Sequence, residues 1–484
     1  MTRDIPGRSF TRRDLLLAAL SAPGFIKAAG AQNEPNPIPA AQATKPIAQT
    51  GPASDAIRAL LSARIESGRD SVGYVAGILD QGGQRLITVG QSDAEDGRPL
   101  DGDTVFEIGS ITKVFTALLL ADMASKGEVA LTDPVAKYLP PEGRPREFDG
   151  KPISLLDLVT YTSGLPRMPA NFSPRDPANP YADYTLAQLY EFVSTMPPVH
   201  YPGSQYEYSN LGFGLLGHAL ALHAGRSYED LVVSRICAPL ELHDTRITLT
   251  SDMRKRLALG HDTGLRKVPN WDLPALAGAG ALRSTGNDLF RFLAACQGRT
   301  QTSLAAAFAS LLDVRRQTGS EGLYAAEGWF VQTAYSDELV WKDGGTGGYA
   351  TFIGYSTRTR IAAVLLSNAA SWDITPRLGR HLLNTSYPLP AIHQQATTDP
   401  AKLAALAGRY EMTPQFVLTV TPTNGRLMVQ ATGQPELDVF PESETQFFYR
   451  AVDAQLTFEL NADGYATALV LHQNGRNRRA TRVP

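Results

Sequence analysis

The sequence predicts a mixed α/β protein: a sheet covered by helices with an added helical lobe, followed by a small antiparallel β-sheet or barrel. Three observations predict it. The 484 residues are 43% hydrophobic and 19% charged, a globular composition with enough chain for two or more cores. A helical pattern at 55–68 alternates with strand-like runs at 72–80, 350–356 and 361–368. Near the C-terminus, short strand-like runs flank hairpin turn signals such as Asn424-Gly425.

The N-terminus has the pattern of an export signal. Arg12 and Arg13 precede an apolar stretch that ends in small residues at 29–31. A membrane anchor is the alternative, but the apolar run is shorter than the roughly 18 to 20 residues that span a bilayer, and it contains Pro23 and Gly24. We expect a twin-arginine signal peptide at 1–31, removed on export to the periplasm.

The remaining chain divides by composition. Residues 32–55 are rich in Pro, Ala and Gln and are expected to form a disordered linker. The α/β domain is expected at 56–388. A second linker-like patch then precedes a β domain at 399–484, where turn signals recur at Asp463-Gly464 and Asn474-Gly475.

Charge and metal-binding residue types exclude several function classes. Lys and Arg number 45 against 48 Asp and Glu, for a net charge of -3, so nucleic acid is not an expected partner. Cys237 and Cys296 have no CxxC spacing, and the eight histidines are scattered. No metal or other cofactor is predicted, and each thiol is expected to be free and buried.

A serine and a lysine lie one helical turn apart where an apolar helix begins. Ser110 and Lys113 would project from the same helix face, and the apolar residues that follow would bury this turn. A desolvated lysine has a lowered pKa and can take the proton of a serine nucleophile. Ser-x-x-Lys alone is more often a helix cap beside a solvated lysine.

Two further segments carry polar groups of the kind that such a site needs. Tyr208 and Asn210 point to one side of an extended segment, where a phenol relays protons and an amide holds a polar substrate group. Read alone, they are a strand aromatic and a helix N-cap. Lys342 precedes a glycine-rich strand opening that lets another backbone approach, although a simple turn is the alternative. Residues 345–350 do not fit a dinucleotide fingerprint, because the third glycine is Ala350.

Together the elements S-x-x-K, Y-x-N and K-x-G resemble those of the penicillin-recognising serine hydrolases, specifically the class C β-lactamase group with its peptidase and esterase relatives. The resemblance covers most of 56–385 and is also carried by the segments LTDPVAKYLP, ISLLDLVTYTSGLP, APLELHDTRIT and GAGALRSTGNDLFRFL. It implies the β-lactamase/transpeptidase fold, an antiparallel sheet flanked by helices and a helical lobe.

The resemblance also implies catalytic roles. Ser110 would be the acylated nucleophile and Lys113 its proton acceptor. Tyr208 would relay protons and act as the base that activates the deacylating water. The backbone N–H groups of Ser110 and Gly345 would form the oxyanion hole.

Substrate binding is implied for a further set of residues. Asn210 would hold the substrate's amide, while Lys342 would attract its carboxylate and keep Tyr208 acidic. Gly344 and Thr346 complete the expected substrate-binding residues.

One departure from the family pattern bears on the substrate. The family's K-T-G is Lys342-Asp343-Gly344 here, and the acid would repel a substrate carboxylate. Retention of the lysine favours β-lactams or D-amino-acid peptides, whereas Asp343 favours small esters. The Pro-rich, aromatic segment 165–185 either shapes the cleft or forms a surface excursion.

The C-terminal β domain resembles the lipocalin-like domain of some peptide-acting relatives, and it either covers the cleft or packs beside it. The expected function is an exported serine hydrolase working through an acyl-enzyme on Ser110. The alternatives are a carboxylesterase and an inactive binding or scaffolding homologue. The expected partner is a small-molecule or peptide substrate, with no stable membrane span after signal cleavage. The oligomeric state is not predicted.

Overall fold

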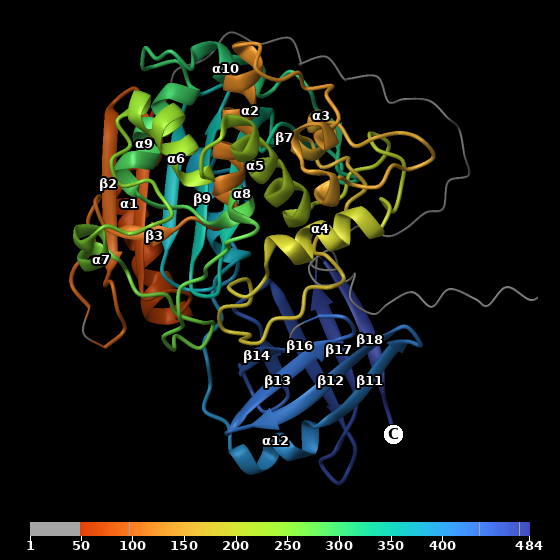
Figure 1. Cartoon of the computed structure of the whole chain (residues 1–484). Coiled ribbons are helices and arrows are strands. Elements are labelled where there is room, and N and C mark those ends of the chain that lie inside the picture. Colours follow the sequence, from red (N-terminus) through yellow and green to blue (C-terminus); the bar gives the residue numbers. More distant parts are fainter. Residues whose placement is uncertain (1–48, 96, 435, 474) are drawn as a thin grey trace, which may run out of the picture. The chain divides into compact units, whose positions relative to one another are not determined.

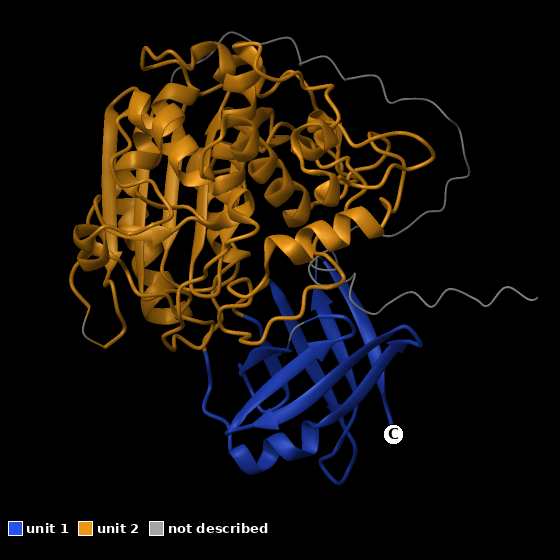
Figure 2. Ribbon diagram, in the orientation of Figure 1, with its two compact units in different colours: residues 1–24, 395–449, 453–484 blue, residues 25–394, 450–452 orange. Residues whose placement is uncertain are grey.

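The computed structural model describes residues 49–484 except 96, 435 and 474 (Figure 1). The expected signal peptide and most of the expected linker, 32–48, therefore lie outside the described residues. The described chain forms two compact units (Figure 2): one holds 49–394 and 450–452, and the other holds 395–449 and 453–484. The first helix, α1, begins at Ser54, two residues before the expected start of the α/β domain.

An eight-stranded antiparallel sheet is the centre of the larger unit, which confirms the expected fold class. The strand order is β2-β1-β10-β9-β8-β7-β6-β5, so β1 pairs with β2 on one side and, on the other, with β10, the last strand of this sheet along the chain. The strands are β1 (Gly73–Asp80), β2 (Gly83–Gly90), β5 (Arg316–Gln317), β6 (Leu323–Ala325), β7 (Phe330–Ala334), β8 (Asp337–Gly345), β9 (Ala350–Ser356) and β10 (Ala362–Ser367).

Helices cover both faces of this sheet. On α11 (Ile374–Leu383), a Cβ at Gly379 would lie 2.2 Å from the ring of Phe352 in β9. On β1, a Cβ at Gly77 would lie 1.9 Å from the ring of Phe290 in α9 (Gly286–Cys296). The register through β10 puts Phe352 on the same face as Ala76, the neighbour of Gly77. Successive strand residues face opposite sides, so α9 and α11 cover opposite faces. Both helices can pack this closely only because residues 77 and 379 are glycines.

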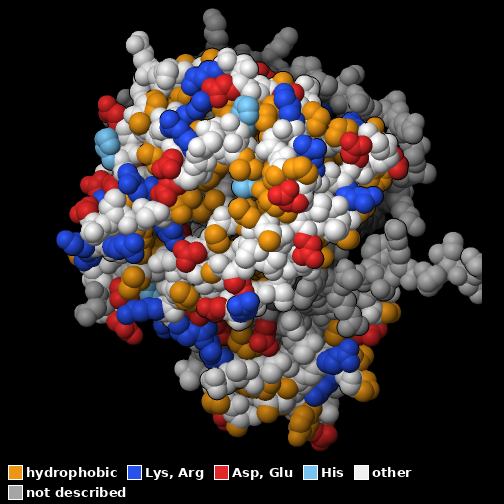
Figure 3. Space-filling view, in the orientation of Figure 1, with side chains coloured by type: hydrophobic (Ala, Val, Ile, Leu, Met, Phe, Trp, Pro, Cys, Tyr) orange, Lys and Arg blue, Asp and Glu red, His pale blue; other side chains and the backbone are white. Residues whose placement is uncertain are grey.

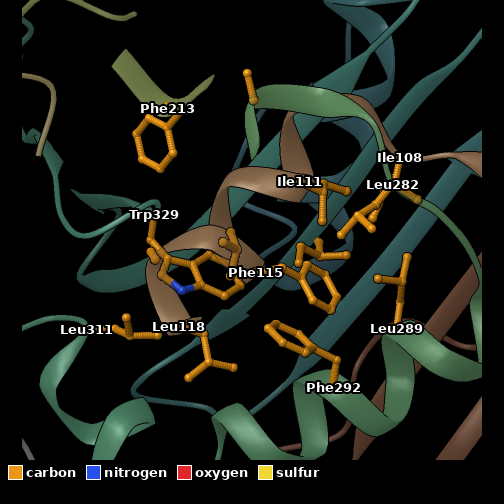
Figure 4. Close-up of a cluster of buried hydrophobic side chains, with 14 of the residues drawn as sticks. Ile108, Ile111, Phe115, Leu118, Phe213, Leu282, Leu289, Phe292, Leu311 and Trp329 are labelled. Atoms are coloured by element: carbon orange, nitrogen blue, oxygen red, sulfur yellow. The ribbon is translucent and has the colours of Figure 1, made fainter. Parts of the chain in front are cut away.

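The helical lobe is built around α2 (Thr112–Ser125), which is buried on all sides from Thr112 to Met123. Its apolar side chains pack with those of neighbouring elements, and Phe115 stacks on Phe292 at a centroid distance of 4.4 Å (Figure 4). A helix that is apolar all round belongs inside a core. The first turn of α2 is therefore held rigidly.

Among the remaining elements of the larger unit, α5 is the longest. Its helices are α1 (Ser54–Ala63), α3 (Leu155–Val159), α4 (Leu186–Thr195), α5 (Asn210–Ala224), α6 (Tyr228–Val232), α7 (Ser251–Arg256), α8 (Ala277–Gly280) and α10 (Ala305–Ser310). Short 3-10 turns are η3 (Gly109–Ile111), η4 (Val135–Tyr138), η5 (Pro141–Gly143) and η7 (Ala238–Leu240), and short π-helical turns are η2 (Arg64–Gly68) and η6 (Val233–Cys237). A two-stranded sheet pairs β3 (Val105–Glu107) with β4 (Arg283–Thr285).

The smaller unit contains a closed eight-stranded antiparallel barrel, as expected, and a helix that was not expected. Asn424 and Gly425 have φ of 52° and 73°, the positive values that a tight hairpin turn requires. The helix is α12 (Pro400–Leu406), where the Asp399 carboxylate accepts from the Ala401 N–H at 2.9 Å. The strands are β11 (Gly408–Thr413), β12 (Phe416–Thr423), β13 (Arg426–Ala431), β14 (Glu436–Pro441), β15 (Gln446–Phe448), β16 (Ala454–Leu460), β17 (Ala466–Gln473) and β18 (Arg476–Val483).

Acidic and basic side chains are interspersed on the face drawn in Figure 3, as the nearly balanced composition leads one to expect. Over the part of the chain that the structure describes, none of the helices combines the length and apolarity of a membrane span.

A buried carboxylate between β6 and β7 makes stability depend on pH. The side chain of Glu327 is 1% exposed, and its Oε2 atom has no hydrogen-bond partner among the described residues. Burial, reinforced by the charge of Asp313, raises the pKa of Glu327 from 4.5 to about 7. The folded state therefore binds a proton that the unfolded state has released, and stability falls as pH rises from 4.5 towards 7.

Glu327→Gln is expected to remove this penalty. It should raise the free energy of unfolding by about 2 to 3 kcal/mol more at pH 8 than at pH 5, as measured by chemical denaturation at both values. Glu321→Gln, at an exposed site near by, should show no such difference. An equal effect of Glu327→Gln at the two pH values would contradict the argument.

Candidate active site

Ser110 and Lys113 meet where η3 leads into α2. The Lys113 ammonium Nζ lies 3.0 Å from the Ser110 Oγ. The buried helix fixes this spacing, because residues three apart share a helix face. Ser110 is only partly exposed, and Lys113 is fully buried.

The Lys113 ammonium has an acceptor for each of its three protons. Besides the Ser110 Oγ, it donates to the Asn210 Oδ1 at 2.8 Å and to the Ala279 carbonyl at 2.7 Å. Burial is the main cause that lowers the pKa of Lys113 to about 8, and the nearby charge of Lys342 lowers it further. Lys113 is thus mainly charged at neutral pH but gives up its proton far more readily than an ordinary lysine.

Tyr208 reaches the same serine from the segment before α5. Its Oη lies 2.8 Å from the Ser110 Oγ. The helix cap at this point is Ser209, whose hydroxyl accepts from the Gly212 N–H at 2.8 Å. Asn210 is therefore not the N-cap and directs its amide to Lys113.

The charge around Tyr208 favours its ionised form. Burial alone would raise the pKa of Tyr208, but the cations of Lys113, Lys342 and Arg167 outweigh it and lower the pKa to about 7. Their charged atoms lie 5.0, 5.2 and 4.9 Å from the ring centroid. The ring of Tyr161 stacks on that of Tyr208 at 4.9 Å, which holds the phenol in place.

Strand β8 brings Lys342, Gly344 and Gly345 to the other side of Ser110. A Cβ at Gly344 would lie 2.0 Å from the Ile108 carbonyl oxygen, so only glycine fits there. A Cβ at Gly109 would lie 2.7 Å from the Gly345 nitrogen. The end of the strand thus runs directly against the turn that carries Ser110, an arrangement in which their N–H groups can share one oxyanion.

Lys342 and Asp343 form an ion pair within this strand. The Lys342 Nζ lies 3.1 Å from the Asp343 Oδ1. Lys342 is 1% exposed, whereas the Asp343 side chain is 37% exposed. Burial disfavours both charges, yet their mutual attraction prevails: the pKa of Lys342 is raised and that of Asp343 is lowered.

Thr346 directly follows Gly345, but its side chain is enclosed. Its side chain is 2% exposed, and its hydroxyl lies beside the buried carboxylate of Glu107. Its backbone carbonyl accepts from the Trp372 indole N–H at 2.9 Å. The structure therefore brings Ser110 together with the other expected residues but encloses the side chain of Thr346.

Three features of the site were not expected from the sequence: the Ala279 carbonyl, the Tyr161 ring and the Arg167 guanidinium. The glycines on either side of Ala279 are a signal for the first, because a Cβ at Gly278 would lie 2.7 Å from the Phe213 carbonyl oxygen. The other two have no local signal, since their positions depend on how distant segments pack.

The remaining polar groups give no sign of a metal site. In the described ranges no group of three or more His, Cys, Asp or Glu side chains could hold a metal ion. Both cysteines are free; Cys237 is buried, as expected, and Cys296 is partly exposed.

The lowered pKa values of the tyrosine and the lysine predict a narrow pH optimum. Catalysis by a phenolate at Tyr208 requires that one proton be lost from the pair formed by Tyr208 and Lys113. Below about pH 7, kcat/KM should therefore rise about tenfold per pH unit. Above about 8, loss of the second proton from Lys113 should lower it again. The measurement is kcat/KM on an uncharged ester from pH 5 to 10 at constant ionic strength. A flat profile between pH 5 and 7 would contradict the assignment.

Two family models together match nearly the whole described chain. The model of the Beta-lactamase family matches residues 57–384. A second family, a domain of unknown function (DUF3471), matches residues 393–482. The boundary between the two matches falls in the segment before α12.

Two bacterial proteins are similar in sequence to this chain. D-alanyl-D-alanine-carboxypeptidase/endopeptidase AmpH of Escherichia coli is 30% identical over 342 residues, covering 67% of this chain and 86% of the relative. A penicillin-binding protein of Bacillus subtilis is 27% identical over 435 residues, covering 83% of this chain and 93% of the relative.

Among solved structures, the class C β-lactamase of Rhodobacter sphaeroides matches with a TM-score of 0.56 at 25% identity. The match covers 66% of this chain and 94% of that structure. The family model, the sequence relatives and the fold agree: the chain belongs to the Beta-lactamase family and is a serine hydrolase.

Proposed function

We propose that this protein forms an acyl-enzyme on Ser110 and hydrolyses D-amino-acid-containing peptides or β-lactams. The observation that carries the proposal is the placement of one hydroxyl between two proton-transfer groups, with the Ser110 Oγ 2.8 Å from the Tyr208 Oη and 3.0 Å from the Lys113 Nζ. The names of the relatives, a carboxypeptidase/endopeptidase and a penicillin-binding protein, support the substrate class.

Acylation begins with the serine proton. Of the two neighbours, Tyr208 has the lower pKa, about 7, while Lys113 keeps its proton for three acceptors. We therefore assign the first proton transfer to the Tyr208 phenolate, with Lys113 as the charge that holds it ionised. The Ser110 Oγ then bonds to the substrate carbonyl carbon.

The negative charge on the carbonyl oxygen is stabilised by the N–H groups of Ser110 and Gly345, where losing one donor typically costs about 2.7 to 4 kcal/mol of barrier. As the C–N bond breaks, the leaving nitrogen takes the proton from Tyr208. Asn210 orients the acyl amide through its Nδ2, which here donates to the weak acceptor Met168 Sδ at 3.7 Å. In deacylation, Tyr208 takes a proton from a water molecule whose oxygen bonds to the acyl carbon. As the bond between that carbon and the Ser110 Oγ breaks, the Oγ takes the proton back from Tyr208.

A second candidate, hydrolysis of small esters, is favoured by one observation. The carboxylate of Asp343 neutralises Lys342 and stands partly exposed beside it. It thereby weakens the attraction that Lys342 would have for a carboxylate on the leaving group. Small esters carry no carboxylate on the leaving group, so this weakened attraction does not reduce their binding.

The test is a substrate panel with an intact-mass readout. Nitrocefin, a D-Ala-D-Ala peptide and p-nitrophenyl acetate are compared, with Ser110→Ala as the blank. A mass adduct on Ser110 with penicillin or a fluorophosphonate supports the acyl-enzyme, and its absence indicates an inactive binding homologue. An ester rate far above both other rates would replace the proposed substrate with the second candidate.

We further propose export to the periplasm, supported by Arg12-Arg13 and the apolar stretch after them. Fractionation of a bacterial host with an intact twin-arginine pathway should place the protein in the periplasm. Replacing both arginines with lysine should retain it in the cytoplasm, and unchanged export of that variant would contradict the proposal.

A further inference from the structure

The active site carries more positive charge than it uses. Lys113, Lys342 and Arg167 each place a cationic group about 5 Å from the ring centroid of Tyr208. Against them stand the carboxylate of Asp343 and the phenolate of Tyr208. One positive charge therefore remains even when Tyr208 is ionised, and this surplus favours an anionic group on the substrate.

Lys342 is poorly placed to supply that charge. It is 1% exposed and already paired with Asp343 at 3.1 Å. An anion that approaches Lys342 meets the more exposed Asp343 carboxylate and is repelled by it. The charge of Lys342 thus lowers the pKa of Tyr208 and is not available to bind an anion of the substrate.

Arg167 has no such competitor. Within the described residues its guanidinium forms no ion pair, and the side chain is partly exposed. Its planar fork is suited to bind a carboxylate through two parallel hydrogen bonds. Among the site's cations that the structure describes, Arg167 is the one free to bind substrate.

The backbone of Arg167 is fixed to the start of α5. Its carbonyl accepts from the N–H groups of Asn210 at 3.0 Å and Leu211 at 3.3 Å. The neighbouring Pro166 carbonyl accepts from the Ser209 hydroxyl at 2.7 Å. Arg167 therefore lies on the Asn210 side of Ser110, where the acyl part of the substrate is expected.

Aromatic residues of the Pro-rich segment line the same side. The charge of Arg167 and a hydrogen bond from Asn210 both act on Tyr181, opposing the burial that raises its pKa. The Tyr181 ring packs on Trp271 at 5.2 Å, and the Trp271 indole N–H donates to the Ala178 carbonyl at 3.0 Å. These contacts indicate that segment 165–185 lines the site and is not only a surface loop.

We propose that Arg167 binds a carboxylate carried on the acyl side of the substrate, next to an apolar group that packs on Tyr181. This inference rests on the proposed acyl-enzyme at Ser110. It makes Arg167 a specificity-determining residue, and it names the substrate class as anionic acyl donors rather than compounds with an anionic leaving group.

Two pairs of substrates that differ by one acyl-side carboxylate test the proposal. The first pair is mono-4-nitrophenyl glutarate and 4-nitrophenyl valerate, and the second is carbenicillin and benzylpenicillin. For each, kcat/KM is measured for the full-length wild type, Arg167→Gln and Arg167→Lys. The matched control is Arg175→Gln, on the same segment but with a side chain that is 92% exposed.

The wild type should prefer the carboxylated member of each pair. Arg167→Gln should lower kcat/KM for that member by about 10- to 100-fold more than for the partner that lacks the acyl-side carboxylate, because a charge-assisted hydrogen bond is lost only there. Any rise in the pKa of Tyr208 affects both members equally and cancels in the ratio. Arg167→Lys should recover part of the preference, and Arg175→Gln should leave it unchanged.

An unchanged ratio in Arg167→Gln, with the Ser110 adduct still formed, would overturn the inference and leave the acyl-enzyme intact. If neither member of either pair acylates Ser110 in the wild type, both the proposed function and this inference fail. Intact mass separates these two outcomes.

Discussion

Ser110→Ala should abolish turnover of every substrate that the protein accepts, with a fall in kcat of about 10⁵- to 10⁶-fold. The reason is chemical: without the Oγ there is no atom to form the acyl bond, and the other groups of the site cannot supply one. The fold should survive, since Lys113 keeps its hydrogen bonds to Asn210 and Ala279. Steady-state rates and intact mass after incubation with penicillin measure both effects.

The control for this variant is Ser204→Ala, on an exposed serine of the segment that leads to Tyr208. It should keep full activity and full acylation. Retained turnover in Ser110→Ala at more than one hundredth of the wild-type rate would show that the nucleophile lies elsewhere.

Tyr208→Phe should lower kcat by about 10²- to 10⁴-fold, the usual contribution of a positioned proton-transfer group. Phenylalanine keeps the stacking on Tyr161 and the cations around the ring, so only the hydroxyl 2.8 Å from the Ser110 Oγ is lost. The loss should appear in kcat more than in KM, because proton transfer acts in the transition state.

Tyr206→Phe is the matched control for the phenol. Tyr206 lies two residues away and packs edge-on against Tyr161 at 5.8 Å. Burial raises its pKa, so its hydroxyl stays protonated. We expect this variant to remain active, and equal activity of the two variants would remove Tyr208 from the mechanism.

The sequence predicts the fold well where the signal is periodic. The helical pattern at 55–68 corresponds to α1 and the turn after it, and the run at 361–368 corresponds to β10. The hairpin signal Asn424-Gly425 forms the turn between β12 and β13. Helix α12 was missed because a short amphipathic run after Asp399-Pro400 is hard to separate from the linker before it.

In the candidate site, too, the sequence predicts what local geometry determines and does not predict what depends on tertiary packing. Ser110 and Lys113 are one turn apart in sequence, so helical geometry alone predicts their meeting. Thr346 illustrates the limit of a motif, because adjacency to Gly345 does not decide which way a side chain faces. Arg167 shows the opposite case, since its contact with Tyr208 arises from tertiary packing that no local pattern records.

The closure of the C-terminal barrel has a consequence for how that unit can recognise anything. Strand β11 pairs with β18, so the ring formed by the described strands has no unpaired backbone edge along which a peptide could add as a further strand. Any partner that docks on it must be held by side chains and loops, whose sequence can change while the ring stays intact.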